Sequence, residues 1–313
     1  MTDLCLGADI GGTKTAVVLC DAHGTIVEQV WAEHDPHRTE SIAERLLPAV
    51  HRVLDHARVP VRAGAVAVSG LVSHDRRTIT HAPTLGARDL PLAALLETET
   101  RLPFAVLNDA NATLLGHFTG LPATEHRHVV LLTLGTGLGG AVAVDGRIVE
   151  GAHGFAGELG HVAVDYDDPR RCLCGAPGCV ENFASGRGLA EMAAEAGLGD
   201  AGEAAAYASR RVVERAATDA AVRALVERAG RMLGRAVTQL SIVLDPDEFI
   251  IGGSVGHAAA DILLPAARAE MRARWPFAGI RALPELRVDS IGPFAGAVGA
   301  ARFARQHHLE AHT

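Results

Sequence analysis

The hydrophobic positions of this chain fall into short apolar runs and into longer stretches with helical spacing. Residues 3–33 hold two or three apolar runs broken by glycine-containing turns, which predicts short strands. Residues 39–57 and 88–101 carry apolar side chains at helical spacing, so we expect a helix in each. Buried strands are expected at 65–68 and 104–107. This order of elements predicts a mixed α/β sheet covered by helices.

The second half of the chain repeats the opening arrangement of strand, glycine turn and strand. Residues 129–134 form a new apolar run that ends in a glycine-rich turn, and this layout indicates an internal duplication. The region 186–244 is rich in alanine and arginine and predicts mainly helix, followed by a strand at 248–251 and a closing helix at 292–308. The pattern pauses near 115–123, where we expect the chain to cross between two domains.

Length and composition narrow the class of protein. A chain of 313 residues is long for one hydrophobic core, so two domains are expected. It is 48% hydrophobic and 21% charged, as in ordinary soluble proteins, and no uncharged apolar run is as long as a membrane span. The N-terminus lacks the basic region of a signal peptide, which predicts a cytoplasmic location. The net charge of −8 argues against a nucleic-acid partner.

Three turns of small residues are candidate binding groups. They are Gly11–Gly12–Thr13, Gly135–Thr136–Gly137 and Gly252–Gly253. Small residues allow the backbone to approach an anion such as phosphate closely. The first turn lies between two strands, unlike the dinucleotide fingerprint, whose glycines open a helix. Asp9, just before it, is well placed to hold a hydrated Mg²⁺, although an aspartate that caps the turn is the alternative.

Polar and small residues follow two of the predicted buried strands. Ser69 and Gly70 follow the first of these, and Asn108 and Asp109 follow the second. Ligands of open α/β sheets bind at such carboxyl ends. A carboxylate on this rigid support can accept the proton of an attacking hydroxyl, and the neighbouring amide can bind a diol. For Asp109 the alternative is a loop carboxylate in an Asx turn.

The five cysteines divide into a cluster of three and a pair. Cys172, Cys174 and Cys179 lie within eight positions, whereas Cys5 and Cys20 lie in apolar runs and are expected to be small buried hydrophobes. A disulfide is possible for any close pair, but an odd number of cysteines in a reducing compartment favours a metal.

Lysine occurs once, at Lys14 in the first glycine turn, among 29 Lys and Arg residues. Either codon bias spared one lysine, or this position needs a compact ammonium near a phosphate. The sequence leaves both interpretations open.

Three segments together resemble the ROK sugar kinases, a family that includes bacterial glucokinases. They are DIGGTK at 9–14, LGTGLGGAVAVDGRIVEGAHGFAGELGH at 134–161 and CLCGAPGCVENFASG at 172–186. The likeness extends over nearly the whole chain. It implies an actin-like/hexokinase-like ATPase fold with a duplicated ribonuclease H-like core, in which ATP and a sugar meet between two lobes, and usually a homodimer.

The resemblance implies lobe boundaries as well. The smaller N-terminal lobe would span 1–118 and be closed by a C-terminal helix at 297–313. The larger lobe would span 119–296 and carry the zinc motif and the dimerisation surface.

The resemblance further implies residue roles. Asp109 would be the general base, and Asn108, Glu158, His161 and Glu181 would contact the sugar. His161 would also bind a structural Zn²⁺ together with the three clustered cysteines, which closes a Cys₃His tetrahedron.

The nucleotide contacts implied by the resemblance involve all three glycine turns. The ATP phosphates would lie on the turns at 11–13 and 135–137. Gly252 and Gly253 would lie near the nucleoside.

The implied reaction is glucokinase-like phosphorylation of a hexose at its primary, C6-type hydroxyl. Thr84 stands where glucokinase-like members carry asparagine, and Ala87 stands where an aromatic residue is common. Either this loop has drifted without effect, or the substrate is an amino sugar, an N-acylhexosamine or a sugar-like cyclitol. ATP and polyphosphate both remain open as the donor.

Two other classes compete with the kinase. A sugar-responsive regulator of the same family would carry an N-terminal DNA-binding helix-turn-helix, whereas here the first strand is expected within a few residues of Met1. A nucleotide-linked oxidoreductase would need G-x-G-x-x-G after the first strand, followed by an acidic residue about twenty positions later, and this pattern is missing.

Overall fold

A computed structural model describes residues 3–12, 14–34, 41–119, 128–199 and 205–310. Its contacts divide the chain into two compact units, Met1–His126 with Ile148–Ala156 and Ile291–Thr313, and Arg127–Arg147 with Gly157–Ser290. We call these unit 1 and unit 2. Thr13, the start of the first predicted helix at 39–40, residues 120–123 of the predicted crossing near 115–123 and residues 311–313 of the predicted C-terminal helix at 297–313 lie outside the described residues.

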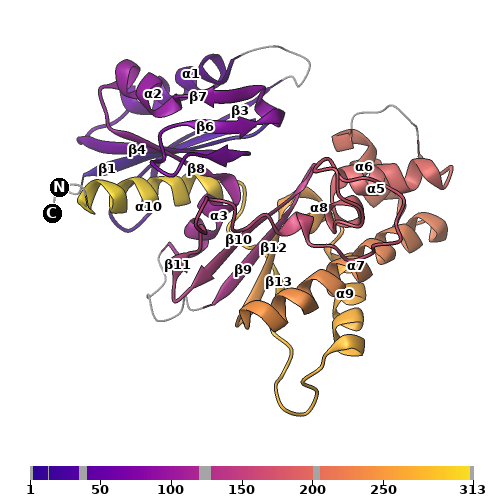
Figure 1. The fold of residues 1–313 in the computed structure, drawn as a ribbon. Coiled ribbons are helices and arrows are strands. Elements are labelled where there is room, and N and C mark those ends of the chain that lie inside the picture. The colour runs from indigo at the N-terminus through magenta and orange to yellow at the C-terminus, as the bar shows by residue number, and fades with distance from the viewer. Residues whose placement is uncertain (1–2, 13, 35–40, 120–127, 200–204, 311–313) are drawn as a thin grey trace. The chain divides into compact units, whose positions relative to one another are not determined.

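Unit 1 is built on a five-stranded sheet with the order β3-β2-β1-β4-β8. Figure 1 shows this sheet with the helices that pack on it. The strands are β1 (Leu4–Ile10), β2 (Lys14–Cys20), β3 (Ile26–Glu33), β4 (Val61–Val68) and β8 (Phe104–Asn108). β1, β2 and β3 are joined as antiparallel neighbours, whereas β1, β4 and β8 run parallel. The predicted strands at 65–68 and 104–107 are confirmed.

Helices cover both faces of this sheet. One face packs on α1 (Ile42–Asp55) and α2 (Leu92–Thr100), and the other packs on α3 (Asp109–His117) and α10 (Ala295–Glu310). Alternate residues of β1 explain the two faces, since Leu6 and Ala8 join the core under α1 and α2, while Cys5 joins the core under α3 and α10. Cys5 and Cys20 are buried and free, as predicted.

Glycines allow α10 to pack very closely on its neighbours. A Cβ on Gly7 of β1 would overlap the backbone of Ala297 in α10. A Cβ on Gly299 would overlap the backbone of Ala112 in α3. These two positions therefore exclude any larger residue.

A small three-stranded sheet, β5-β6-β7, accompanies the main sheet of unit 1. Its strands are β5 (Leu71–Val72), β6 (Ile79–Ala82) and β7 (Ala87–Leu90), with the short helix η1 (Pro83–Leu85) between the last two. The predicted helix at 88–101 is wrong in its first residues, which form β7, and the helix begins only at Leu92. Pro91 is the reason, because the residue before a proline is disfavoured in helical conformation.

The segment Ile148–Ala156 packs with unit 1 although it follows the hairpin of unit 2. Glu150 forms an ion pair with Arg76, whose guanidinium lies 4.6 Å from the ring centroid of Phe303 in α10. Ile148 packs against the core under α10. These contacts anchor the segment.

Unit 2 repeats the sheet of unit 1 in the order β11-β10-β9-β12-β13. The strands are β9 (Val129–Leu134), β10 (Leu138–Val144), β11 (Arg147–Ile148), β12 (Glu248–Gly252) and β13 (Glu285–Val288). β9 and β10 are antiparallel, and β9, β12 and β13 run parallel. The predicted internal duplication is confirmed, because the central strands of both sheets share one order and one set of directions.

The helices of unit 2 are α4 (Glu181–Ala184), α5 (Gly186–Glu195), α6 (Ala205–Arg215), α7 (Ala220–Leu244), α8 (Gly253–Ala258) and α9 (Ala260–Arg274), with the short helix η3 (Leu159–His161) before them. Three of them, α5, α6 and α7, lie within the region 186–244 that was predicted to be helical, whereas α4, α8 and α9 lie outside it. α7 packs along α9, where Gly230 and Gly234 meet the α9 backbone closely (Figure 1). Within the described ranges, no helix combines the length and apolar character needed to cross a membrane.

Candidate functional site

The carboxyl ends of the three parallel strands in unit 1 lie at one level. Ile10 of β1 pairs with Val68 of β4, and Val68 pairs with Asn108 of β8. The residues that follow these strands therefore emerge along the same edge of the sheet. The structure thus brings together Asp9, Gly11, Gly12, Ser69, Gly70, Asn108 and Asp109, all of which the sequence singled out.

Asn108 caps the helix that begins at Asp109. Its side-chain oxygen accepts hydrogen bonds from the amides of Ala110, at 2.9 Å, and Asn111, at 3.1 Å. Its side-chain nitrogen donates to the carbonyl oxygen of Gly70 at 3.3 Å, which joins the β8 end to the β4 end. Hydrogen bonds to the start of α3 and to Gly70 therefore fix the Asn108 side chain.

Asp109 is the first residue of α3 and is half-buried. One carboxylate oxygen accepts a hydrogen bond from the amide of Ala110 at 2.9 Å. The positive end of the α3 dipole and this amide both favour the ionised carboxylate, which is the form that can accept a proton.

The first glycine turn closes next to this edge. The amide of Gly11 donates to the carbonyl of Lys14 at 2.9 Å, and the Cα of Gly12 faces the carbonyl of Thr84 with room to spare. Burial raises the pKa of Asp9 to about 6, and the charge of Lys14 opposes that rise. The Lys14 ammonium also lies 5.1 Å from the ring centroid of Trp31.

The two residues that depart from the glucokinase-like pattern lie in the small sheet. The hydroxyl of Thr84 in η1 faces the carbonyl of Ser69 at 3.5 Å, so this side chain lies beside the β4 end. Ala87 begins β7 and pairs with Ala82 of β6. The short side chains at 84 and 87 therefore lie on the element next to the predicted substrate residues Ser69 and Gly70.

The second glycine turn connects β9 and β10 in unit 2. The amide of Gly135 donates to the carbonyl of Gly137 at 3.0 Å, while the carbonyls of Gly135 and Thr136 accept from the amides of Gly186, at 2.8 Å, and Arg187, at 3.1 Å. Within the described part of the chain, the amides of Thr136 and Gly137 make no hydrogen bond. These two amides are available to bind an anion, and nothing lies within 4 Å of the position that a Cβ on Gly135 would take.

The third glycine turn lies beside the second. Gly252 ends β12 and Gly253 begins α8 with a φ of +83°, where glycine is favoured. A Cβ on Gly253 would overlap the backbone of Leu134, the residue before the second turn. His257 lies 3.8 Å from the buried carboxylate of Asp289 at the same sheet edge.

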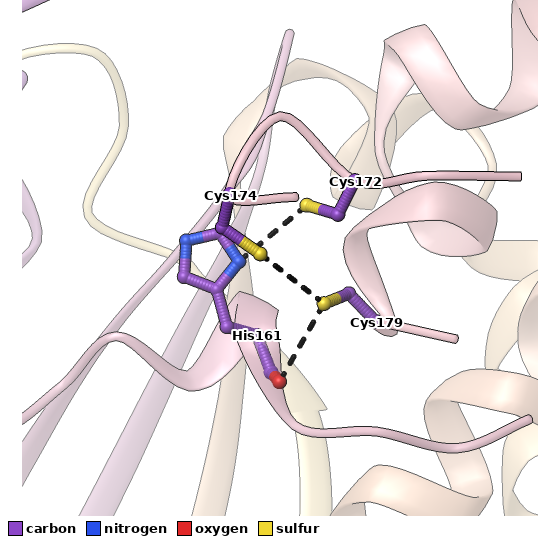
Figure 2. Close-up of side chains that lie close together, drawn as sticks. All are labelled: His161, Cys172, Cys174 and Cys179. Atoms are coloured by element: carbon purple, nitrogen blue, oxygen red, sulfur yellow. Dashed lines mark hydrogen bonds between the residues drawn. The ribbon is translucent and has the colours of Figure 1, made fainter. Parts of the chain in front are cut away.

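Figure 2 shows a cluster of His161, Cys172, Cys174 and Cys179 in unit 2, whose ligand atoms all lie within 4.8 Å of one another. Cys172 Sγ lies 3.5 Å from His161 Nδ1, and Cys174 Sγ lies 3.7 Å from Cys179 Sγ. A tetrahedral zinc with ordinary bond lengths requires about 3.5 Å between sulfur and nitrogen and about 3.8 Å between sulfurs. The donor set therefore fits this metal.

The cysteines of this cluster are free thiols and form no disulfide. Burial raises the pKa of the Cys179 thiol to about 12, so this thiol stays protonated at neutral pH unless a cation lies beside it. The loop folds locally, since the amide of Cys172 donates to the carbonyl of Ala176 and Gly175 and Gly178 adopt φ of +88° and +72°. Its glycines explain why eight positions suffice for three ligands.

The three residues predicted to contact a sugar beside this cluster are arranged around it. His161 presents Nδ1 to Cys172 and presents Nε2 to the carboxylate of Glu158, 3.7 Å away. Glu181 lies two residues after Cys179 and begins α4. One of its oxygens accepts the amide of Leu138 at 3.0 Å, and the other accepts Arg187 Nη2 at 2.7 Å.

The sequence analysis did not predict that Arg187 and Leu138 donate hydrogen bonds to Glu181. Arg187 lies in the segment ENFASGRG among many other arginines of this chain, and nothing in its spacing separates it from them.

Comparison with known proteins identifies the family. The model of the ROK family matches residues 5–307. The chain belongs to the ROK family. Its relatives include the glucokinase of Streptomyces coelicolor, 32% identical over 97% of this chain and 98% of that protein. They also include the N-acetylmannosamine kinase of Citrobacter koseri, 34% identical over 81% of this chain and 84% of that protein.

A solved ROK structure has the same architecture. The ROK family glucokinase of Streptomyces griseus, in complex with glucose and AMPPNP, superposes with a TM-score of 0.81 at 32% identity, covering 97% of this chain and 99% of that one. The expected actin-like/hexokinase-like ATPase fold is confirmed. The ROK resemblance seen in the three sequence segments is confirmed with it.

Proposed function

We propose that this ROK protein is an ATP-dependent sugar kinase, glucokinase-like, which phosphorylates a hexose or a hexose-like substrate at its primary hydroxyl. Its similarity to glucokinases over nearly the full chain supports this activity. The structural observation that carries the proposal is the carboxylate of Asp109 at the carboxyl end of β8, held beside Asn108 on the N-terminus of α3.

Asp109 is the proposed general base. Phosphoryl transfer needs mainly positioning and charge neutralisation, together with a group that accepts the proton of the attacking hydroxyl. The β8–α3 junction provides a fixed carboxylate, and the neighbouring Asn108, Ser69 and Gly70 would orient the sugar. Glu158, His161 and Glu181 of unit 2 would contact further hydroxyls.

The glycine turns would bind the nucleotide. The two unused amides at Thr136 and Gly137 can each donate to a phosphate oxygen, and Gly252–Gly253 would lie near the nucleoside. Asp9 would hold a hydrated Mg²⁺, and the Gly11–Thr13 turn after it would bind phosphate. The metal would supply neutralisation of phosphate charge when bound.

The cluster in Figure 2 would hold a structural Zn²⁺. Its ligands would be His161, Cys172, Cys174 and Cys179, and four protein ligands leave no open position for substrate. The ion would keep the loop that carries His161 and Glu181 in place.

Two lines of evidence bear on the acceptor. The relatives include both glucokinases and N-acetylmannosamine kinases, which act on different acceptors. The short side chains of Thr84 and Ala87 leave more room than the asparagine and the aromatic residue of the glucokinase-like pattern. We propose a hexose first, with an amino sugar, an N-acylhexosamine or a cyclitol as the alternative.

The assembly and its setting follow the family expectation. We propose a cytoplasmic homodimer of two-lobed chains, with lobes at 1–118, closed by the helix at 297–313, and at 119–296, and with the dimer surface on the second lobe.

A coupled ADP-release screen over hexoses, hexosamines, N-acylhexosamines and cyclitols tests the proposal, with ATP and polyphosphate as donors. Asp109→Asn should lower the sugar-dependent rate by about 10²–10⁴-fold, because the proton acceptor is lost while the shape remains. Asp55→Asn, at the exposed end of α1 and outside the proposed site, serves as the control. No sugar-dependent ADP release with any acceptor, or a rate unchanged in Asp109→Asn, would contradict the assignment.

A further inference from the structure

The metal-binding loop is the segment that carries Cys172, Cys174 and Cys179. Arg187 contacts both the residue that follows this loop, Glu181, and the second glycine turn. Its guanidinium pairs with Glu181 at 2.7 Å, and its other terminal nitrogen lies 3.9 Å from Glu191. Its backbone amide donates to the carbonyl of Thr136 in the turn. The side chains of Arg187 and Glu181 are only 16% and 12% exposed, so this ion pair is largely shielded from water.

Glu181 connects its ion pair with Arg187 to the second glycine turn and to Cys172. The oxygen that does not face Arg187 accepts the amide of Leu138, the first residue after the turn. The same oxygen packs under Gly137, where a Cβ would come within 3.0 Å of it. On the other side, Cys172 Sγ lies 3.6 Å from the oxygen that faces Arg187.

The charges explain why an arginine is needed here. A Zn²⁺ with three thiolates and a neutral imidazole carries a net charge of about −1, and the Glu181 carboxylate adds a second negative charge directly beside it. Arg187 brings the compensating positive charge. Removing one partner of a shielded pair leaves the other charge uncompensated, which costs far more than the loss of an exposed pair.

We infer that Arg187 is a positioning residue that holds Glu181 against the 135–138 turn, so that the metal-binding loop sets the nucleotide affinity of the turn. The inference rests on the proposed function. It assigns Arg187 no contact with the sugar, and it makes Glu181 a support of the turn as well as a candidate sugar contact.

Binding of AMPPNP, measured by calorimetry without sugar, tests the inference. Arg187→Met keeps the apolar stem but removes the charge and the donors, and it should weaken AMPPNP binding about tenfold or more while zinc content stays near that of the wild type. Arg210→Met is the matched control, because Arg210 forms a similar 3.0 Å pair with Glu214 on the exposed surface of α6, and it should change binding less than twofold.

A double-mutant cycle decides whether Arg187 acts through Glu181. Glu181→Gln should also weaken AMPPNP binding. The fold-loss of AMPPNP affinity in the double variant should be clearly smaller than the product of the fold-losses in the two single variants. Independent, multiplying losses would overturn the inference, and so would an Arg187→Met protein that is folded, loaded with zinc and unchanged in affinity.

Arg187→Lys keeps the inference testable if Arg187→Met does not fold. This variant keeps the charge but loses the planar fork, and it should show intermediate affinity and faster hydrogen exchange of the amides at 134–138. Wild-type exchange and affinity in this variant would overturn the inference. A wild-type chain that binds AMPPNP but phosphorylates no sugar would refute the proposed function and leave this test intact.

Discussion

At the scale of single residues, Asp9 occupies an unfavourable position for a charged side chain. Its carboxylate lies at the end of β1 against Gly296 of α10, where a Cβ would come within 2.6 Å of it. Burial raises its pKa to about 6, so ionisation in the folded state costs free energy. A carboxylate kept under such conditions is typical of a functional group, which agrees with the proposed role at Mg²⁺.

We predict that Asp9→Asn stabilises the protein at pH 8 and abolishes most of its kinase activity. The folded pKa lies above the unfolded value, so the cost of the carboxylate is absent below about pH 4, grows as the pH rises towards 6 and is complete above it. With allowance for partial exposure, the gain at pH 8 should be on the order of 1–2 kcal/mol, and it should be smaller at pH 4.5. Urea unfolding at both pH values measures it.

Asp75→Asn provides a control of opposite sign. A hydrogen bond from Ser73, with one from the Arg77 amide, lowers the pKa of the exposed Asp75. The stabilisation from this carboxylate is present above the unfolded pKa and is lost as the pH falls, so Asp75→Asn should reduce stability at both pH values. Destabilisation of Asp9→Asn at pH 8 would contradict the assigned environment.

At the scale of elements, both sheets put their glycine turns at the point where an antiparallel hairpin meets parallel neighbours. In unit 1 this is the turn after β1, and in unit 2 it is the turn after β9. The helices α3, α5 and α8 begin at these edges and present their N-termini there. In unit 2, the backbone of α5 donates to the second turn, and the start of α8 packs against Leu134, the residue before that turn. α10 packs against the first edge, where Gly296 lies against Asp9 and Gly299 lies against the α3 backbone.

We predict that Gly299→Ala destabilises unit 1, because its Cβ would overlap the backbone of Ala112 in α3 and force α10 away from its partners. The cost should be about 1–3 kcal/mol, as for other overpacked core positions. Gln306→Ala on the exposed side of the same helix is the control and should change stability by less than about 0.5 kcal/mol. Equal stability of the two variants, by calorimetry, would contradict the close packing.

At the scale of the whole molecule, one architecture is used twice with different chemistry. The sheet edge of unit 1 carries the carboxylates Asp9 and Asp109, whereas the edge of unit 2 combines the buried carboxylate of Asp289 with the unused amides of Thr136 and Gly137 and adds the cysteine loop. Acidic groups suit a metal and a hydroxyl proton, and amides suit phosphate. Duplication followed by divergence of the two edges thus accounts for the proposed division of labour.

We predict that metal removal acts mainly on unit 2. Treatment with a strong zinc chelator should lower the thermal stability and reduce AMPPNP affinity and kinase activity, because the loop of Cys172, Cys174 and Cys179 loses its centre. Hydrogen exchange should speed up at 158–188 and stay unchanged in β1 and β4 of unit 1.

Cysteine variants control for chelation. Cys179→Ser should reproduce the loss and lower zinc content, whereas Cys20→Ala, which removes a buried thiol outside the cluster, should retain bound zinc. Full activity of the metal-free protein would refute the structural role of the ion.

Local sequence pattern determined a large part of this protein. The β4 and β8 strands, the closing helix, the burial of Cys5 and Cys20 and the repeat of strand, turn and strand were all predictable, because they depend on periodicity and on residues close in sequence. The cysteine cluster was predictable for the same reason, since its three thiols lie within eight positions and glycines fold the loop.

Only the tertiary structure decided the contacts between distant segments. Glu181 meets Leu138 across 43 positions of sequence, and Arg187 becomes distinct from the other arginines only because α5 begins under the turn. The return of 148–156 to unit 1 through Glu150 and Arg76 likewise left no local signal. Spacing and periodicity report which face of an element is buried, whereas the partner of that face is chosen by packing of the complete chain.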